Sequence, residues 1–187
     1  MVSVVSKIGF SQGWIGAARR CESPHFNRRP DNEVSLLVIH NISLPAGCFG
    51  LPYIDQLFQG CLDRDADASF CELDGLRVSA HFLIRRDGEL VQYVSCDDRA
   101  WHAGVSSYRG REGCNDFAIG IELEGTDDTP YSDAQYQQLV QLTLALFDAY
   151  PMLNVDAIVG HCDIAPGRKT DPGESFDWTR YKKGLEG

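Results

Sequence analysis

The sequence predicts a single α/β domain with a mixed β-sheet. Segments 35–40 and 156–160 each contain an unbroken apolar run that leads to a histidine, a pattern typical of strands buried on both faces. Residues 78–94 have the pattern of a β-hairpin, because an Asp-Gly pair, a strong tight-turn signal, separates two apolar runs. Apolar residues recur at helical spacing over 132–150. A sheet that combines hairpin strands with strands joined through a helix is mixed.

The composition fits one domain of ordinary globular character. The chain has 187 residues, which is enough for one sizeable core and short for two. Hydrophobic residues make up 43% and charged residues 24%, so we expect one domain over residues 1–187. No segment approaches the ~20 apolar residues of a membrane span.

The net charge argues against polyanionic partners. The chain has 17 basic and 27 acidic residues and a net charge of −10, whereas a nucleic-acid surface needs clustered Lys and Arg. The same charge disfavours docking on an anionic membrane, although it leaves room for a local basic patch inside a pocket. We therefore expect no nucleic-acid or membrane partner. A monomer is the expected oligomeric state, although the charge does not determine it.

The start of the chain and its cysteines predict a cytoplasmic protein. Lys7 follows a short apolar patch, which is the reverse of the order in a secretory signal. The seven cysteines are odd in number and lack a CxxC pair. Such a scattered set is typical of free thiols in a reducing compartment.

The first half of the chain contains a lead-in, a strand and a short helix. Residues 1–33 show little periodicity and predict an irregular lead-in. The strand at 35–40 follows, and residues 53–58 predict a short helix. The alternating aspartates at 63–67 are similar to a calcium loop, but the required glycine and closing glutamate are not in place. We expect this loop to be solvated surface.

The second half contains a strand, the clearest helix and a short tail helix. Strand 117–125 is apolar except for two glutamates. Ser132 and Gln135 form a capping box at the start of the helix, and Pro151 stops it. The last strand precedes His161, and the tail from Asp177 has room for one short helix.

Two histidines and one aspartate are candidate metal ligands. His40 and His161 each end an apolar strand, so parallel neighbouring strands would place both imidazoles at the same end of the sheet. Pro-Gly pairs at 166–167 and 172–173 fold the loop back and can bring Asp171 near His161. A catalytic zinc site usually takes three protein ligands and a water. A structural role at a strand end is the alternative for each histidine.

A zinc hydrolase also needs a base and a cationic group. Zinc lowers the pKa of a bound water toward ~7, and a carboxylate must then accept its proton. Glu122 and Glu124 are candidates, because a charge in an apolar strand is costly unless it is used. Glu122 has apolar neighbours on both sides, whereas Glu124 is expected to face solvent. Lys169 lies near Asp171 and could stabilise an oxyanion, although spacing alone favours a surface lysine.

Other reactive side chains fit less well as catalytic groups. Cys162 follows His161 directly, and adjacent side chains of an extended chain point in opposite directions, so a buried free thiol is favoured over a nucleophile. His81 begins a strand. This position favours a structural role for its side chain, or a role in supporting the metal ligands from behind. Trp101 and His102 lie in a loop where an aromatic and a polar side chain suggest a pocket wall.

Short motifs along the chain point to one known family. They are Leu37-Val38-Ile39-His40-Asn41, Ser79-Ala80-His81-Phe82, Arg86-Asp87-Gly88, Trp101-His102-Ala103-Gly104, Asn115-Asp116 and Gly120-Ile121-Glu122. These resemble the zinc-dependent N-acetylmuramoyl-L-alanine amidases, which include phage lysozyme-type amidases and peptidoglycan-recognition proteins. Segments 40–45, 120–126 and 161–173 resemble the members that act on 1,6-anhydro-N-acetylmuramyl peptides in Gram-negative cytoplasm. The likeness runs from about residue 12 to residue 182.

The resemblance assigns roles to the candidate residues. It implies Zn²⁺ bound by His40, His161 and Asp171, with Glu122 as general base and Lys169 as transition-state stabiliser. The implied fold is a central mixed sheet flanked by helices, with zinc in a groove at its edge. The implied reaction is hydrolysis of the amide between the lactyl group of (1,6-anhydro-)N-acetylmuramic acid and L-alanine, in cell-wall recycling.

The implied substrate suggests further contacts. Its peptide carries carboxylates, so guanidinium groups are expected near the groove, and Arg77 and Arg111 are the candidates. Asn41 lies beside a ligand and could hydrogen-bond substrate, with Trp101 and His102 as pocket wall. A surface role is the alternative for each arginine.

Two other functions compete with the zinc amidase. A protein of this fold can bind muropeptides without cutting them, typically after losing a zinc ligand. All three ligand positions and both catalytic positions are present here, which weighs against a binding module. The third interpretation is an amidase in which Cys162 is the nucleophile.

Overall fold

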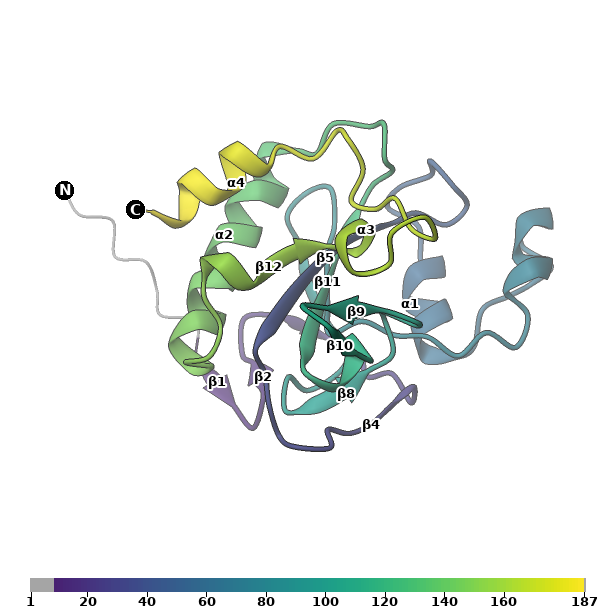
Figure 1. The fold of residues 1–187 in the computed structure, drawn as a ribbon. Coiled ribbons are helices and arrows are strands. Elements are labelled where there is room, and N and C mark those ends of the chain that lie inside the picture. The colour runs from purple at the N-terminus through teal and green to yellow at the C-terminus, as the bar shows by residue number, and fades with distance from the viewer. Residues whose placement is uncertain (1–8, 187) are drawn as a thin grey trace.

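Figure 1 shows a computed structural model of the protein, which describes residues 9–186. A six-stranded mixed sheet forms the centre, in the order β12–β5–β11–β6–β7–β3. Its strands are β3 (Arg19–Arg20), β5 (Leu36–Ile42), β6 (Phe82–Ile84), β7 (Leu90–Gln92), β11 (Ala118–Glu124) and β12 (Ile158–Gly160). The prediction drawn from Lys7 lies outside the described residues.

Smaller elements surround the central sheet. Three two-stranded sheets pair β1 (Phe10–Ser11) with β2 (Trp14–Ile15), β4 (Phe26–Arg28) with β8 (Asp98–Ala100), and β9 (Ser107–Tyr108) with β10 (Arg111–Glu112) within residues 9–186. The α-helices are α1 (Tyr53–Gln59), α2 (Asp133–Ala149), α3 (His161–Ile164) and α4 (Trp178–Leu185). Short 3-10 helices are η1 (Ala68–Leu73), η2 (Cys114–Asp116) and η3 (Val155–Ala157).

Four neighbouring strands run parallel, so their carboxyl ends meet at one edge of the sheet. β5 pairs in parallel with β11 on one side and with β12 on the other. β6 is parallel to β11 and antiparallel to β7, which confirms the predicted mixed sheet. Glu122 on β11 lies opposite His40 on β5. Residues opposite one another in a parallel pair point to the same face, so these two side chains share a face.

One face of the sheet is covered by α2 and α4, which lie side by side (Figure 1). Ser132 and Gln135 form the predicted capping box at the start of α2. The helix packs in one core with alternate residues of the central strands, Leu37, Ile39, Ile119, Ile121 and Leu123. Tyr181 of α4 is fully buried, and its hydroxyl lies 2.6 Å from Thr143 Oγ1 of α2.

The opposite face of the sheet is covered by shorter helices and loops. Helix α1 packs through Ile54, Leu57 and Phe58 in a core that includes residues of β6 and β7. A separate cluster joins Val38 of β5 with Ile164 of α3. Because α3 begins directly after β12, its first residue stands at the edge where the parallel strands end.

The predicted elements are confirmed with small shifts in their boundaries. The last strand begins two residues later than expected, because Asn154 caps a 3-10 helix ahead of it. The described part of the lead-in contains the short strands β1 to β4. All seven cysteines are free thiols, as expected. None of the helices within residues 9–186 combines the length and apolar character needed to cross a membrane.

Candidate metal centre

Three side chains converge at the carboxyl edge of the parallel strands. His40 lies on β5, His161 begins α3, and Asp171 lies in the loop after α3. The two Nδ1 atoms lie 3.0 Å apart, and Asp171 Oδ2 lies 3.1 Å from His40 Nδ1 and 3.0 Å from His161 Nδ1. The three candidate ligands therefore form a nearly equilateral triangle of nitrogen and oxygen atoms.

The loop after α3 is bent back by the predicted turn residues. Gly167 and Gly173 have φ values of +75° and +81°, which glycine adopts without steric cost. A Cβ at Gly173 would lie 2.2 Å from the Cα of Asp127, so only glycine fits there. The backbone N–H of Cys162 donates to the carbonyl of Asp171 at 3.0 Å and closes the loop. The fold thus carries Asp171 back to His161.

The three side chains fit a zinc ion. Tetrahedral zinc with bonds of about 2.0–2.1 Å to nitrogen and oxygen places neighbouring ligand atoms about 3.3–3.4 Å apart, close to the observed triangle. His161 Nε2 lies 3.2 Å from the carbonyl oxygen of Ala103. A carbonyl only accepts, so the proton of neutral His161 lies on Nε2 and its Nδ1 lone pair points into the triangle. Converging acceptor atoms require a cation or a proton between them.

The ionisation of His40 and Asp171 also suits a metal. Burial lowers the pKa of His40 to about 4, so its imidazole is neutral at pH 7. Burial opposes ionisation of Asp171, but His161 and His40 hold the pKa of this carboxyl well below its usual range. Metal ligands must be deprotonated, and His40 and Asp171 are.

Glu122 is a buried carboxyl group on the same face of the sheet. It is 8% exposed, and its Oε2 atom has no hydrogen-bond partner among the described residues. Burial raises its pKa well above the usual value, Asp171 adds to the effect, and the Lys169 ammonium opposes it. A buried carboxyl group with a raised pKa, and with one oxygen that has no hydrogen-bond partner, is suited to exchange a proton.

Lys169 lies on the loop between α3 and Asp171. Its backbone N–H donates to the carbonyl of Ala165 at 3.1 Å. Its side chain is exposed and makes no ion pair within residues 9–186. The ammonium is therefore available to a ligand at this edge of the sheet.

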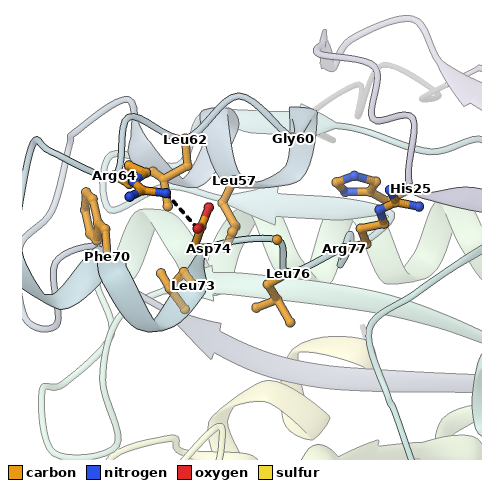
Figure 2. Close-up of a pocket in the computed structure, with 11 residues that line it drawn as sticks. His25, Leu57, Gly60, Leu62, Arg64, Phe70, Leu73, Asp74, Leu76 and Arg77 are labelled. Atoms are coloured by element: carbon orange, nitrogen blue, oxygen red, sulfur yellow. Dashed lines mark hydrogen bonds and ion pairs between the residues drawn. The ribbon is translucent and has the colours of Figure 1, made fainter.

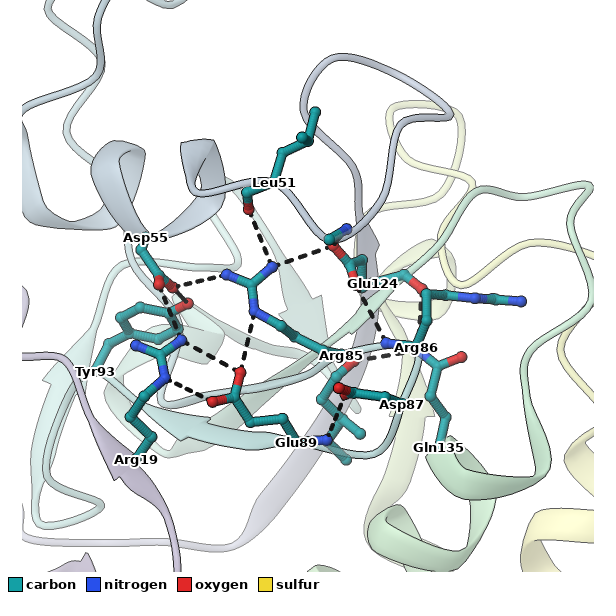
Figure 3. Close-up of polar contacts among 12 residues, drawn as sticks. Arg19, Leu51, Asp55, Arg85, Arg86, Asp87, Glu89, Tyr93, Glu124 and Gln135 are labelled. Carbon is teal, nitrogen blue, oxygen red and sulfur yellow. Dashed lines mark hydrogen bonds and ion pairs between the residues drawn. The ribbon is translucent and has the colours of Figure 1, made fainter.

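Glu124 does not face solvent, and that expectation is wrong. Its carboxylate is 1% exposed and accepts hydrogen bonds from the N–H of Gly50 at 2.7 Å and of Arg86 at 3.2 Å. Arg85 donates to it at 3.2 Å and also pairs with Asp55 of α1 (Figure 3). The charge is thus paired and serves to join β11 to the loop before α1.

Two of the side chains predicted to contact substrate form hydrogen bonds within the protein itself. Asn41 donates through Nδ2 to Asp127 Oδ1 at 2.8 Å. Trp101 donates through Nε1 to Asn27 Oδ1 at 2.7 Å, and its ring stacks on His25 at a centroid distance of 6.0 Å. Both side chains are half-buried, so part of each remains accessible to a ligand.

The two predicted arginines lie apart from each other. Arg77 lines a cavity of about 330 Å³ near α1 and η1, with His25 and apolar side chains in its wall (Figure 2). Arg111 on β10 pairs with Glu33 at 2.8 Å and lies 3.9 Å over the ring of Phe117. Arg77 is therefore freer than Arg111 to bind a carboxylate.

Three polar side chains lie behind the ligands: half-buried His102, buried His81, for which the sequence predicted such a place, and buried Arg29, which the sequence did not indicate. His102 Nδ1 lies 3.0 Å from His40 Nε2, and burial holds the pKa of His102 well below its ordinary value. His81 is buried and accepts the N–H of Gly120 at 3.0 Å. Arg29, 4% exposed, donates to backbone carbonyls, including that of Ala118 at 2.9 Å. Residues 1–33 show no periodic pattern that would have indicated that Arg29 is buried.

Comparison with known proteins gives a consistent match. The family described as N-acetylmuramoyl-L-alanine amidase matches residues 30–174. The chain is 63% identical over 172 residues to the 1,6-anhydro-N-acetylmuramyl-L-alanine amidase AmpD of Escherichia coli, covering 91% of this chain and 93% of that protein.

Solved structures agree with the sequence match. A crystal structure of a Se-Met AmpD derivative superposes with a TM-score of 0.92 at 60% identity, covering 95% of this chain and 99% of that one. The Escherichia coli amidase AmiD, solved with anhydro-N-acetylmuramic acid-L-Ala-D-gamma-Glu-L-Lys, gives a TM-score of 0.59 at 29% identity. That alignment covers 95% of this chain and 65% of AmiD. The central mixed sheet and flanking helices are thus shared with these enzymes.

Proposed function

Because the chain belongs to the N-acetylmuramoyl-L-alanine amidase family, we propose that it hydrolyses the amide between 1,6-anhydro-N-acetylmuramic acid and the L-alanine of a stem peptide. The observation that carries the proposal is the convergence of two histidines and one aspartate within 3.1 Å, beside a buried glutamate. The 63% identity to AmpD over nearly the whole chain supports the substrate.

The proposed cofactor is Zn²⁺ held by His40, His161 and Asp171. Members of this family are zinc-dependent in general. The ion would supply Lewis-acid polarisation of the scissile carbonyl and acidify a water molecule. The neutral imidazole of His40 and the ionised carboxylate of Asp171 support this assignment.

Glu122 and Lys169 are the proposed catalytic side chains. Glu122 accepts a proton from the attacking water and returns it to the leaving nitrogen of L-alanine. Its raised pKa favours that return, and a bound cation would favour the ionised carboxylate that must accept the proton first. Lys169 donates to the oxygen on which negative charge develops.

The proposed ligand is a small muropeptide. AmiD, a relative of the same fold, was solved with an anhydromuramyl peptide. Asn41, Arg77, Trp101 and Arg111 remain our candidates for contacts with it. Of these, Arg77 has the guanidinium most available for a stem-peptide carboxylate. We place the reaction in cytoplasmic cell-wall recycling, which the seven free thiols support.

The test combines metal analysis with a muropeptide digest analysed by mass. We expect one zinc per chain and release of anhydromuramic acid, and a chelator should abolish this release. Full activity after verified removal of zinc would contradict the proposal. A zinc-loaded protein that binds the muropeptide without cutting it would identify a binding module instead.

The thiol alternative is tested in the same assay. Cys162→Ser should keep its activity, because burial raises the pKa of the Cys162 thiol and so disfavours the thiolate. Loss of activity in this variant, together with resistance to chelation, would favour a cysteine amidase.

A further inference from the structure

The outer nitrogens of both candidate zinc ligands face one dipeptide, His102-Ala103. His40 Nε2 lies 3.0 Å from the Nδ1 atom of His102. His161 Nε2 lies 3.2 Å from the carbonyl oxygen of Ala103. Metal-ligating histidines almost always donate their other ring N–H to an acceptor, which orients the ring and determines the tautomer. Two consecutive residues here offer both acceptors.

The proton on His161 is determined by the backbone alone. The Ala103 carbonyl has two lone pairs and no hydrogen, so His161 Nε2 must donate to it. Arg168 Nη2 donates to the second lone pair at 2.7 Å and also to the carbonyl of Val105 at 2.7 Å. Arg168 therefore holds the 103–105 segment against the loop that carries Lys169 and Asp171.

The proton on His40 depends on a side chain. A zinc ion between the three ligands needs the Nδ1 lone pair of His40, which leaves the proton on Nε2. Among residues 9–186 the acceptor within reach of that proton is His102 Nδ1, at 3.0 Å, so His102 must act as the acceptor. The proton of neutral His102 then lies on Nε2, which has no partner among these residues. If His102 instead donated, the proton of His40 would point into the metal site.

The dipeptide is itself held rigidly. Asn115 Oδ1 accepts the backbone N–H groups of His102 at 3.1 Å and of Ala103 at 2.8 Å. Asn115 is 7% exposed. The His102 ring lies edge-on to that of His40, with centroids 5.1 Å apart. Gly120 makes room for it, because a Cβ there would lie 2.5 Å from His102 Cγ.

We propose that His102 and Ala103 together set the tautomers of His40 and His161, so that both Nδ1 lone pairs face the metal. His102 is then a positioning residue behind a zinc ligand rather than part of the substrate-binding wall. This inference rests on the proposed zinc site and names the residues that prepare it. Asn115 and Arg168 hold the two acceptors in place.

A matched pair of variants isolates the acceptor. His102→Asn keeps an acceptor oxygen near the position of Nδ1, whereas His102→Leu has similar branching and no acceptor. Loss of such a partner typically weakens metal affinity 10- to 100-fold. We expect about this loss for His102→Leu in a chelator competition for zinc, and an affinity closer to that of the unmodified protein for His102→Asn.

The second measurement needs no substitution. Long-range ¹H–¹⁵N correlation spectra of the zinc-loaded protein report which ring nitrogen carries a proton. We expect protons on Nε2 of His40 and His161 and none on Nδ1 of His102. A proton on His102 Nδ1, or unchanged zinc affinity in His102→Leu, would overturn the inference. An asparagine variant as weak as the leucine variant would also overturn it, because packing would then explain both losses.

The outcomes separate this inference from the proposed function. Zinc affinity and proton positions are measured without substrate. Correct tautomers in a protein that leaves muropeptides intact would refute the amidase function alone. Normal cleavage together with wild-type zinc affinity in His102→Leu would refute the tautomer inference alone.

Discussion

At the scale of single residues, Glu122 combines burial with an unpartnered carboxyl oxygen. Glu122→Gln keeps the shape of the side chain and removes its ability to accept a proton. We expect kcat to fall by about 10²- to 10⁴-fold, the usual contribution of general acid–base catalysis. Steady-state kinetics on a muropeptide measure the loss, and zinc content should stay at the wild-type level. An active glutamine variant would remove Glu122 from the proposed chemistry.

Gly120 is required by the histidine that packs on it. Gly120→Ala would place a Cβ 2.5 Å from His102 Cγ and force the ring away from His40. We expect a loss of about 1–3 kcal/mol in unfolding free energy, as in other overpacked sites, and weaker zinc binding. Urea unfolding and chelator competition measure the two effects.

Gly16 provides the control for this substitution. A Cβ there meets nothing within 4 Å, so Gly16→Ala should leave both quantities near wild type. Equal behaviour of the two alanine variants would show that the contact at Gly120 relaxes without cost.

At the scale of elements, the start of α2 depends on Ser132. Its hydroxyl accepts the N–H of Gln135 at 3.1 Å and donates to the carbonyl of Arg86 at 2.6 Å. Ser132→Ala should cost about 1 kcal/mol, the usual loss for an N-cap, with an unchanged denaturant slope. Ser107→Ala on exposed β9 is the control. A midpoint equal to that of the control would contradict the role of the cap.

The ion-pair network around Glu124 joins β11, the β6–β7 turn and the loop before α1 (Figure 3). Glu124→Ala would leave the Arg85 guanidinium, 11% exposed, without one of its carboxylate partners. Breaking a buried pair on one side typically costs about 3–5 kcal/mol. Because Asp55 and Glu89 also pair with Arg85, we expect the lower end of that range.

Unfolding and amide exchange measure the consequences of this change. We expect faster hydrogen exchange at Gly50, whose N–H donates to Glu124. Exchange at Gly50 equal to wild type would show that the loop is held by other contacts.

At the scale of the whole molecule, the proposed zinc site ties together segments far apart in the sequence. Its ligands come from β5, α3 and the loop after α3, with His40 and Asp171 separated by 131 positions. A ligand that binds only the folded state stabilises it by RT ln(1 + [L]/Kd), about 2.7 kcal/mol at 100 Kd. We therefore expect zinc to raise the unfolding temperature.

Asp171→Ala provides the contrast for this prediction. The variant should lose most of the zinc-dependent rise, because one of three ligands is gone. Lys7→Ala, far from the site in sequence, is the control and should keep the rise. A zinc effect of equal size in Asp171→Ala would place the ion elsewhere.

The sequence by itself determined the elements and the kinds of side chain at the site. Unbroken apolar runs predicted β5 and β12, and the capping box predicted α2, because these are local patterns. The family resemblance followed from short motifs and is confirmed by the match over residues 30–174. The side chains expected near one another, His40, His161 and Asp171, do converge, since parallel strands end at one edge.

Only the tertiary structure decided how that site is supported. In the sequence, Glu124 lies near the end of a strand and was expected to face solvent. Folding brings its partners to it from the β6–β7 turn and from the loop before α1. His102 was expected in a pocket wall, and folding brings its Nδ1 atom to 3.0 Å from Nε2 of His40, 62 positions away. Hydrogen-bond partners at such separations leave no periodic signal along the chain, because sequence patterns record local geometry and burial. The acceptors behind the ligand histidines are therefore visible only in the folded protein.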